Sequence, residues 1–312
     1  NKSSIELWIS VIMIVDVKVS DLIVGHYVVD IVKQTSNYSL TQAGHIKNKA
    51  VIQHLISKGV ESVLIDKSKT KYPEKDSTIH EFEQQDNAQL ILNVRKAKEI
   101  FNESKEIQKK VFADAQQGVA LDLTPVIDIT DKTIEEIFRN SDALACVINL
   151  RNKDEYLLEH SVSVSILMTI FSRFLKIEKS LVQQLAIGAF LHDVGKINIP
   201  DEILNKPAKL TEQEFTIMKT HVNHSIDIIK RTPGISAISL EVATLHHEKL
   251  DGTGYPFNVP ASEISTYGRM IAICDIFDAL TAHRCYKQGY SHVKAFNILR
   301  NLATQGHLEQ RL

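Results

Sequence analysis

Histidine and aspartate residues recur at wide, similar intervals through the second half of this 312-residue sequence. The series consists of His160, the adjacent pair His192-Asp193, His221, the adjacent pair His246-His247, and Asp275. The intervals are 32, 28, 25 and 28 residues, and each fits one helix with its connection to the next. A helical bundle can therefore bring five imidazoles and two carboxylates to one level of its core.

Such a set of side chains can do metal chemistry. A single tetrahedral zinc ion needs only four ligands, so seven ligands suit two octahedral ions better. A carboxylate such as Asp193 can bridge the two ions. Two ions roughly 3.5–4 Å apart can activate a water molecule and hold phosphate oxygens during in-line phosphoester hydrolysis. The ligand types leave iron, manganese, cobalt, nickel and zinc open.

The composition limits the other functions of the chain. Lys and Arg total 36 against 38 Asp and Glu, and the net charge of −2 argues against binding of polymeric nucleic acid. Three cysteines without a CxxC pair favour a reducing, cytoplasmic setting over a disulfide scaffold. The apolar run at residues 7–15 is about half a bilayer span, and no other segment comes closer, so we expect no membrane insertion.

The elements of the N-terminal third predict a small α+β domain over residues 1–66. Residues 9–19, 27–32 and 60–65 are rich in β-forming side chains, and residues 41–58 have apolar side chains at helical spacing. Residues 67–80 are rich in Lys, Ser and Asp, which predicts a flexible linker.

The rest of the chain is predicted to be helical. Residues 81–149 form a helical connector whose narrow apolar stripe fits a homodimeric coiled coil, a link between domains, or a helix packed on its own domain. Pro125 is expected to interrupt it, with Thr130 or Asp131 capping the next helix. Residues 150–312 predict an all-α bundle, in which Thr211 and Glu214 form a capping box.

Two stretches around the histidines resemble a known family. The stretch Phe190-Leu-His-Asp-Val-Gly-Lys-Ile-Asn-Ile-Pro200 resembles the signature of the HD superfamily of metal-dependent phosphohydrolases. The stretch His246-His-Glu-Lys-Leu-Asp-Gly-Thr-Gly-Tyr-Pro256 is similar to the second signature of its HD-GYP subfamily. Residues 218–221, 269–280 and 284–287 also match, so the resemblance covers residues 150–312. Residues 24–30 are similar to the uncharacterised domain that often precedes HD-GYP domains.

The resemblance implies a bacterial phosphodiesterase that opens a cyclic dinucleotide, above all cyclic di-GMP, to a linear dinucleotide. It implies one metal ion held by His160, His192, Asp193 and Asp275, and a second held by Asp193, His221, His246 and His247. A third ion is not expected, because Tyr156 stands where some members of the family have an additional glutamate.

The resemblance also implies contacts with the substrate. Lys196 would act on a phosphate oxygen or the leaving group, and Arg284 and Lys287 would bind substrate phosphates. Tyr255, in the Gly254-Tyr255-Pro256 loop, would shape the edge of the pocket or only pack there, and the same loop is a candidate contact for a signalling protein. Two alternatives stay open: 3′3′-cyclic GMP-AMP as the preferred substrate, and a catalytically weak receptor or interaction module.

Overall fold

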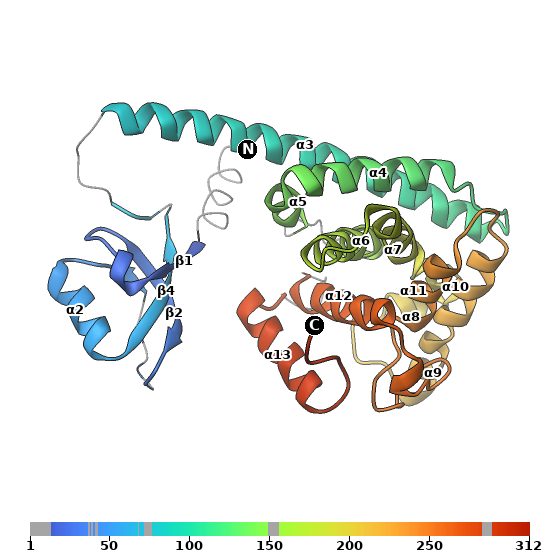
Figure 1. Ribbon diagram of the computed structural model, residues 1–312. Coiled ribbons are helices and arrows are strands. Elements are labelled where there is room, and N and C mark those ends of the chain that lie inside the picture. The colour runs from blue at the N-terminus through green and yellow to red at the C-terminus, as the bar shows by residue number, and fades with distance from the viewer. Residues whose placement is uncertain are drawn as a thin grey trace. The chain divides into compact units, whose positions relative to one another are not determined.

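The chain forms two compact units, Asn1–Asn87 and Ala88–Leu312 (Figure 1). The computed structural model describes residues 14–36, 38, 40, 43–67, 69–71, 77–148, 156–282 and 289–312, without the side chains of 14, 77–90 and 156. The boundary between the units falls within helix α3 (Ser77–Gln116).

The first unit contains a four-stranded antiparallel sheet and a helix. Its strands β1 (Ile14–Lys18), β2 (Tyr27–Gln34), β3 (Gly44–His45) and β4 (Val60–Asp66) follow the order β1-β4-β2-β3. The inner strand β4 contributes the buried side chains of Val63 and Ile65, and α2 (Lys49–Ser57) contributes Leu55 to the same core. The α+β prediction for this part of the chain is confirmed.

The helical prediction for residues 41–58 is wrong for residues 43–48, while residues 41 and 42 lie outside the described residues. Residues of β3 instead extend the sheet by pairing with β2, and α2 begins only at Lys49. The side-chain oxygen of Asn48 accepts hydrogen bonds from the N–H groups of Ala50 and Val51. This cap determines where the helix starts, because it satisfies backbone donors that the first turn leaves free.

The second unit is helical, as predicted. After α3 its elements are α4 (Thr124–Arg139), α5 (Ser141–Val147), α6 (Tyr156–Phe174), α7 (Lys179–Leu191), η3 (Val194–Asn198), α8 (Asp201–Leu204), α9 (Glu212–Lys219), α10 (His221–Lys230), α11 (Ala237–Leu245), η4 (Ala261–Glu263), α12 (Thr266–Thr281) and α13 (His292–Thr304). Within the described ranges, none of these helices has the length and apolar character needed to cross a membrane.

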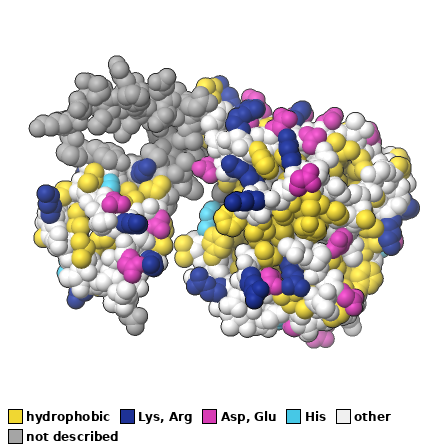
Figure 2. Space-filling model, in the orientation of Figure 1, with side chains coloured by type: hydrophobic (Ala, Val, Ile, Leu, Met, Phe, Trp, Pro, Cys, Tyr) yellow, Lys and Arg dark blue, Asp and Glu magenta, His cyan; other side chains and the backbone are white. Residues whose placement is uncertain are grey.

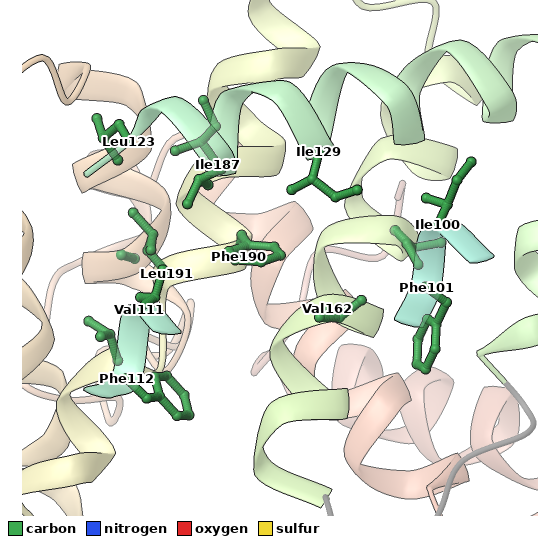
Figure 3. Packing of buried hydrophobic residues seen from close by; sticks show 14 of the residues in the cluster. Ile100, Phe101, Val111, Phe112, Leu123, Ile129, Val162, Ile187, Phe190 and Leu191 are labelled. Carbon is green, nitrogen blue, oxygen red and sulfur yellow. The ribbon is translucent and has the colours of Figure 1, made fainter. Parts of the chain in front are cut away.

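Helix α7 lies at the centre of the main core. Every residue from 185 to 191 is buried, so this helix has apolar contacts on all sides. Figure 3 shows Phe190 and Leu191 of α7 in one cluster with Ile129 of α4, Val111 of α3 and Val162 of α6. Since α7 ends at Leu191, this packing positions the two residues that follow it, a histidine and an aspartate.

The break predicted around Pro125 lies earlier in the chain, at residues 117–123, between the end of α3 and the start of α4. Pro125 lies in the first turn of α4, where its missing N–H group costs nothing. The helix continues through Thr130, whose buried hydroxyl donates to the carbonyl four residues earlier and caps nothing. A second break follows at Asn140, whose side chain caps α5. The capping box predicted at Thr211 and Glu214 is confirmed.

The surface of the second unit carries charges of both signs. On the face shown in Figure 2, Lys and Arg side chains alternate with Asp and Glu around a hydrophobic patch. That face lacks the continuous positive field with which proteins bind the phosphates of polymeric nucleic acids.

Gly195 of η3 packs directly against α10. Its N–H group donates to Oγ of Ser225 at 2.8 Å. A Cβ atom at position 195 would lie 2.2 Å from the carbonyl oxygen of His221 and 2.3 Å from the backbone nitrogen of Ser225. Only glycine permits this approach, which brings the segments that carry Asp193 and His221 together.

We expect Gly195→Ala to lower the free energy of unfolding of the second unit by about 2 kcal/mol or more, because the methyl group would collide with backbone atoms. Urea unfolding, followed by the circular dichroism of the helices, measures this loss. Gly44→Ala is the matched control, since a Cβ atom there meets nothing within 4 Å. Equal stability of the two variants would contradict the close contact.

Candidate metal centre

The seven predicted ligands meet inside the second unit. His160 lies in α6, His192 and Asp193 follow α7, His221 begins α10, His246 and His247 follow α11, and Asp275 lies in α12. Six of these side chains are buried, and that of His247 is 24% exposed. His247 therefore lies on the side from which a ligand could reach the centre.

Asp193 lies between two groups of ligands, and each of its carboxylate oxygens faces a different group. Oδ2 is 3.3 Å from Nε2 of both His160 and His192. Oδ1 is 3.3 Å from Nε2 of His221 and 3.8 Å from Nε2 of His246. A carboxylate placed in this way can bridge two cations.

Each group is compact enough to surround one ion. Ligand atoms within each group all lie within 4.8 Å of one another, and the groups are His160, His192 and Asp275 on one side and His221, His246 and His247 on the other. The geometry thus brings together the same two ligand sets that the sequence resemblance implies, with Asp193 between them.

Backbone carbonyls orient three of the imidazoles. Nδ1 of His192, His221 and His246 each lies 2.7 Å from the carbonyl oxygen three residues earlier. Because a carbonyl oxygen can only accept, Nδ1 carries the proton and Nε2 is left with a lone pair. In the described part of the chain, Nε2 of His192 and Oδ1 of Asp193 are buried without a hydrogen-bond partner. Such atoms are costly unless a cation binds them, so the residues fit divalent metal ions.

The two carboxylates stay ionised despite their burial. Burial opposes the charge of Asp193, but His192 and Lys196 hold the pKa of its carboxyl well below its usual range. Nζ of Lys196 is 2.5 Å from Oδ2 of Asp193. Burial is also the largest influence on Asp275 and opposes its charge, but the nearby imidazoles of His160, His247 and His192 together outweigh it and lower the pKa of that carboxyl. Ionised carboxylates are the form that binds metal.

Two of the histidines are held in the neutral form. Burial lowers the pKa of His247 to about 3, against the opposing effect of Asp275. Burial, together with the neighbouring His247 and His192, also lowers the pKa of His246 well below its usual value. Neutral imidazole is the form that coordinates metal, so these shifts favour metal binding at neutral pH.

Asp278 supports His160 and was missed by the sequence analysis. It is fully buried in α12, and its Oδ2 accepts a hydrogen bond from Nδ1 of His160 at 2.7 Å. Nε2 of His160 then points to Oδ1 of Asp275, 3.0 Å away. Asp275 and Asp278 are three residues apart on one face of the helix, and this pair of acids in an apolar segment was the available signal.

Glu248, also missed, holds the loop that carries Tyr255. Its buried carboxylate accepts the N–H groups of Phe257 at 2.7 Å and Val259 at 3.1 Å. The N–H group of Tyr255 donates to the carbonyl of His247, and the two rings lie 4.7 Å apart. The loop is thereby tied to the metal centre, and the position of Glu248 directly after the histidine pair was the signal.

Three other residues that the sequence singled out are not fully described by the structure. Arg284 and Lys287 lie outside the described residues, and so does the side chain of Tyr156. Glu159, next to His160, is buried and forms an ion pair with Lys105 of α3 at 3.1 Å.

Comparison with known families agrees with this geometry. Residues 146–312 match the HD domain, and residues 14–126 match a domain of unknown function, DUF3391. The chain belongs to the HD-domain family. The resemblance predicted from the sequence is confirmed, and the matched HD domain includes all seven predicted ligands.

Two curated relatives of this HD-domain protein match more than half of the chain. Cyclic di-GMP phosphodiesterase PA4108 of Pseudomonas aeruginosa is 36% identical over 219 residues, which are 70% of this chain and 52% of that protein. The 3′3′-cGAMP-specific phosphodiesterase 2 of Vibrio cholerae is 31% identical over 193 residues, which are 61% of this chain and 36% of that protein. The chain thus spans about half or less of these relatives.

A solved structure shares the fold of this HD-domain protein. Bd1817, an HDG"Y"P protein from Bdellovibrio bacteriovorus, superposes with a TM-score of 0.58 at 18% identity. The match covers 95% of this chain and 96% of that one. At this level of identity it shows a common fold.

We expect the metal-free protein to lose stability as the pH falls from 7 to 5. His246 and His247 take up protons near pH 6.5 when the chain is unfolded but only at lower pH when it is folded. The unfolded state therefore binds more protons in this window, and each histidine removes about 1 kcal/mol per pH unit. Asp193 and Asp275 add to the loss of stability only below about pH 4, because above that pH both carboxyls are ionised in the folded and in the unfolded state.

Urea unfolding of the chelator-treated protein at pH 7, 6 and 5 measures this decline. His247→Gln removes one of the two groups and should give a shallower dependence on pH. If that substitution leaves the dependence of the unfolding free energy on pH unchanged, the fold does not hold His247 neutral.

We expect Asp278→Asn to weaken metal binding about 10–100-fold, because the amide no longer provides a charged acceptor for the Nδ1 proton of His160. Competition with a chelator of known affinity, followed by metal analysis, measures the change. Asp227→Asn, at an exposed position on α10, is the matched control. Equal affinity in both variants would contradict a supporting role for Asp278.

Proposed function

We propose that this HD-domain protein is a metal-dependent phosphodiesterase that hydrolyses a cyclic dinucleotide, with cyclic di-GMP as the first candidate. The observation that carries the proposal is the position of Asp193, whose two oxygens face two separate groups of buried ligands. The similarity to a cyclic di-GMP phosphodiesterase of Pseudomonas aeruginosa supports the choice of substrate.

Two divalent ions fit the ligand set. We assign one to His160, His192, Asp193 and Asp275, and the other to Asp193, His221, His246 and His247. Bound there, the ions would supply an activated water molecule and neutralise charge on the phosphate oxygens. The imidazoles offer Nε2 lone pairs of fixed direction, so little reorganisation is needed when a metal binds.

Two further side chains act on the substrate in this proposal. Lys196 contacts Asp193 and keeps 17% of its side chain exposed, so its ammonium group can also reach a phosphate oxygen or the departing 3′ oxygen. Burial, with the charges of Asp275 and Asp193, raises the pKa of Tyr255, whose hydroxyl therefore stays protonated and can donate a hydrogen bond. Water attacks phosphorus, the bond from phosphorus to the 3′ oxygen breaks, and a linear dinucleotide is released.

A second substrate is supported by a specific relative. The 3′3′-cGAMP-specific phosphodiesterase 2 of Vibrio cholerae is 31% identical to this chain, so 3′3′-cyclic GMP-AMP is the main competitor of cyclic di-GMP. The two substrates differ in one base, whereas the metal centre acts on the phosphate that they share. We also infer that Arg284 and Lys287 bind the substrate phosphates, as the sequence analysis predicts.

The setting of the reaction is part of the same proposal. Cys146 and Cys274 are free thiols, which fits a reducing compartment such as the cytoplasm. A homodimer and a signalling partner at the Gly254-Tyr255-Pro256 loop remain predictions from the sequence.

We expect the purified protein, loaded with Mn²⁺ or Fe²⁺, to convert cyclic di-GMP or 3′3′-cyclic GMP-AMP to a linear product. Asp193→Asn should reduce the rate by more than about 100-fold, because it removes the charge that would bridge the ions. Chromatography of the nucleotides and metal analysis of the same samples provide the measurement, with Asp227→Asn as the control. Intact substrates after verified metal loading would overturn the proposal.

A further inference from the structure

Helix α9 presents an aromatic ring and a cation beside the metal centre. Phe215 is 47% exposed, and Lys219 lies one turn later on the same face of the helix. None of the residues of α9 is buried, so these two side chains do not serve the core of the unit.

The start and the end of α9 are both held in place. At the start, Thr211 and Glu214 form the capping box, and Glu214 also pairs with Lys206 at 2.7 Å. At the end, the carbonyl of Met218 accepts the Nδ1 proton of His221. The face of α9 is therefore kept at a fixed distance from a predicted metal ligand, as a binding site requires.

Tyr255 connects this face to the metal centre. Its ring lies 4.7 Å from that of His247 and 6.4 Å from that of His221. The ring of Phe215 stands edge-on to the ring of Tyr255, with the two ring centres 6.4 Å apart. Nζ of Lys219 lies 5.3 Å from the ring centre of Phe215 and 5.9 Å from that of Tyr255.

Lys219 has no acidic partner among the residues that the structure describes, in contrast to its neighbours. Lys206 is paired with Glu214, and Lys196 with Asp193. The ammonium group of Lys219 rests against two ring faces, which attract it weakly and leave its charge free to act on an anion.

The chemistry of a cyclic dinucleotide matches this arrangement. Such a molecule carries two phosphodiesters and two bases, whereas the metal centre can act on only one phosphodiester at a time. In addition to Arg284 and Lys287, which we propose for the phosphates, a cation close to the centre can bind the second phosphodiester, and bases stack well on exposed aromatic rings.

We propose that Lys219, Phe215 and Tyr255 form a subsite for the half of the substrate that is not cleaved. Lys219 contacts the second phosphodiester, and the ring of Phe215 stacks on a purine base. This inference rests on the proposed function, since it assigns a site to the second half of that substrate.

The test compares Lys219→Met, which removes the charge but keeps an apolar chain, and Phe215→Leu, which removes the ring. Each should raise KM for cyclic di-GMP about tenfold, with the loss in KM rather than in kcat. For Lys219→Met, the ratio of kcat/KM for cyclic di-GMP to that for methyl p-nitrophenyl phosphate should fall by a similar factor. The latter compound has a single phosphate and no purine.

Two controls match the substitutions. Lys230→Met changes the last residue of α10, nine residues beyond His221, and Phe174→Leu changes the last residue of α6 at a side chain that is 78% exposed. Metal content and melting temperature are measured for every variant. An unchanged KM in Lys219→Met, or an equal loss on both substrates, would overturn the subsite.

A separate binding measurement tests the subsite independently of the proposed function. If the metal-loaded wild-type protein hydrolyses no cyclic dinucleotide, the proposed function fails, and calorimetric titration with cyclic di-GMP then decides about the subsite. Weaker binding by Lys219→Met than by the wild type supports the subsite. Equal binding by both, or no binding by the wild type, refutes it.

Discussion

A buried carboxylate between two groups of imidazoles is the constraint on which the second unit depends. Removing the charge of Asp193 from water costs several kcal/mol unless cations and hydrogen-bond donors surround it. The ammonium group of Lys196 supplies one such partner, and the histidines on either side direct lone pairs toward the same space. Only a rigid core can hold so many polar atoms at fixed positions, and the apolar packing around α7 provides such a core.

The ends of helices meet both the structural and the chemical needs of the centre. His192 and His246 directly follow α7 and α11, and His221 is the first residue of α10, shortly after the end of α9. Each of these histidines donates its Nδ1 proton to a carbonyl in the last turn of the preceding helix. Such carbonyls lack partners within their own helix. The same bonds fix the direction of Nε2 in each of these histidines.

The surroundings of the ligands were harder to predict than the ligands themselves. Residues of the ligand type stand at intervals of one helix and its connection, and apolar periodicity predicts that these intervals are helical. Asp278 and Glu248 are marked in the sequence only by their positions near predicted ligands, and the groups that they contact become clear only in the folded chain. Local chemistry also decided where elements begin: Asn48 starts α2 later than the apolar spacing suggests, and Pro125 opens α4 instead of ending a helix.

The sequence by itself determined the small α+β part and the helical class of the second unit, and it predicted the candidate ligands, because residue type and periodicity are local properties. Tertiary structure alone decided that the two oxygens of Asp193 face different histidine groups, that the loop of Tyr255 is tied to His247, and that Lys219 lies without a carboxylate partner in the described part of the chain. These features depend on distances between helices that are far apart in the chain, and packing rather than local propensity fixes such distances.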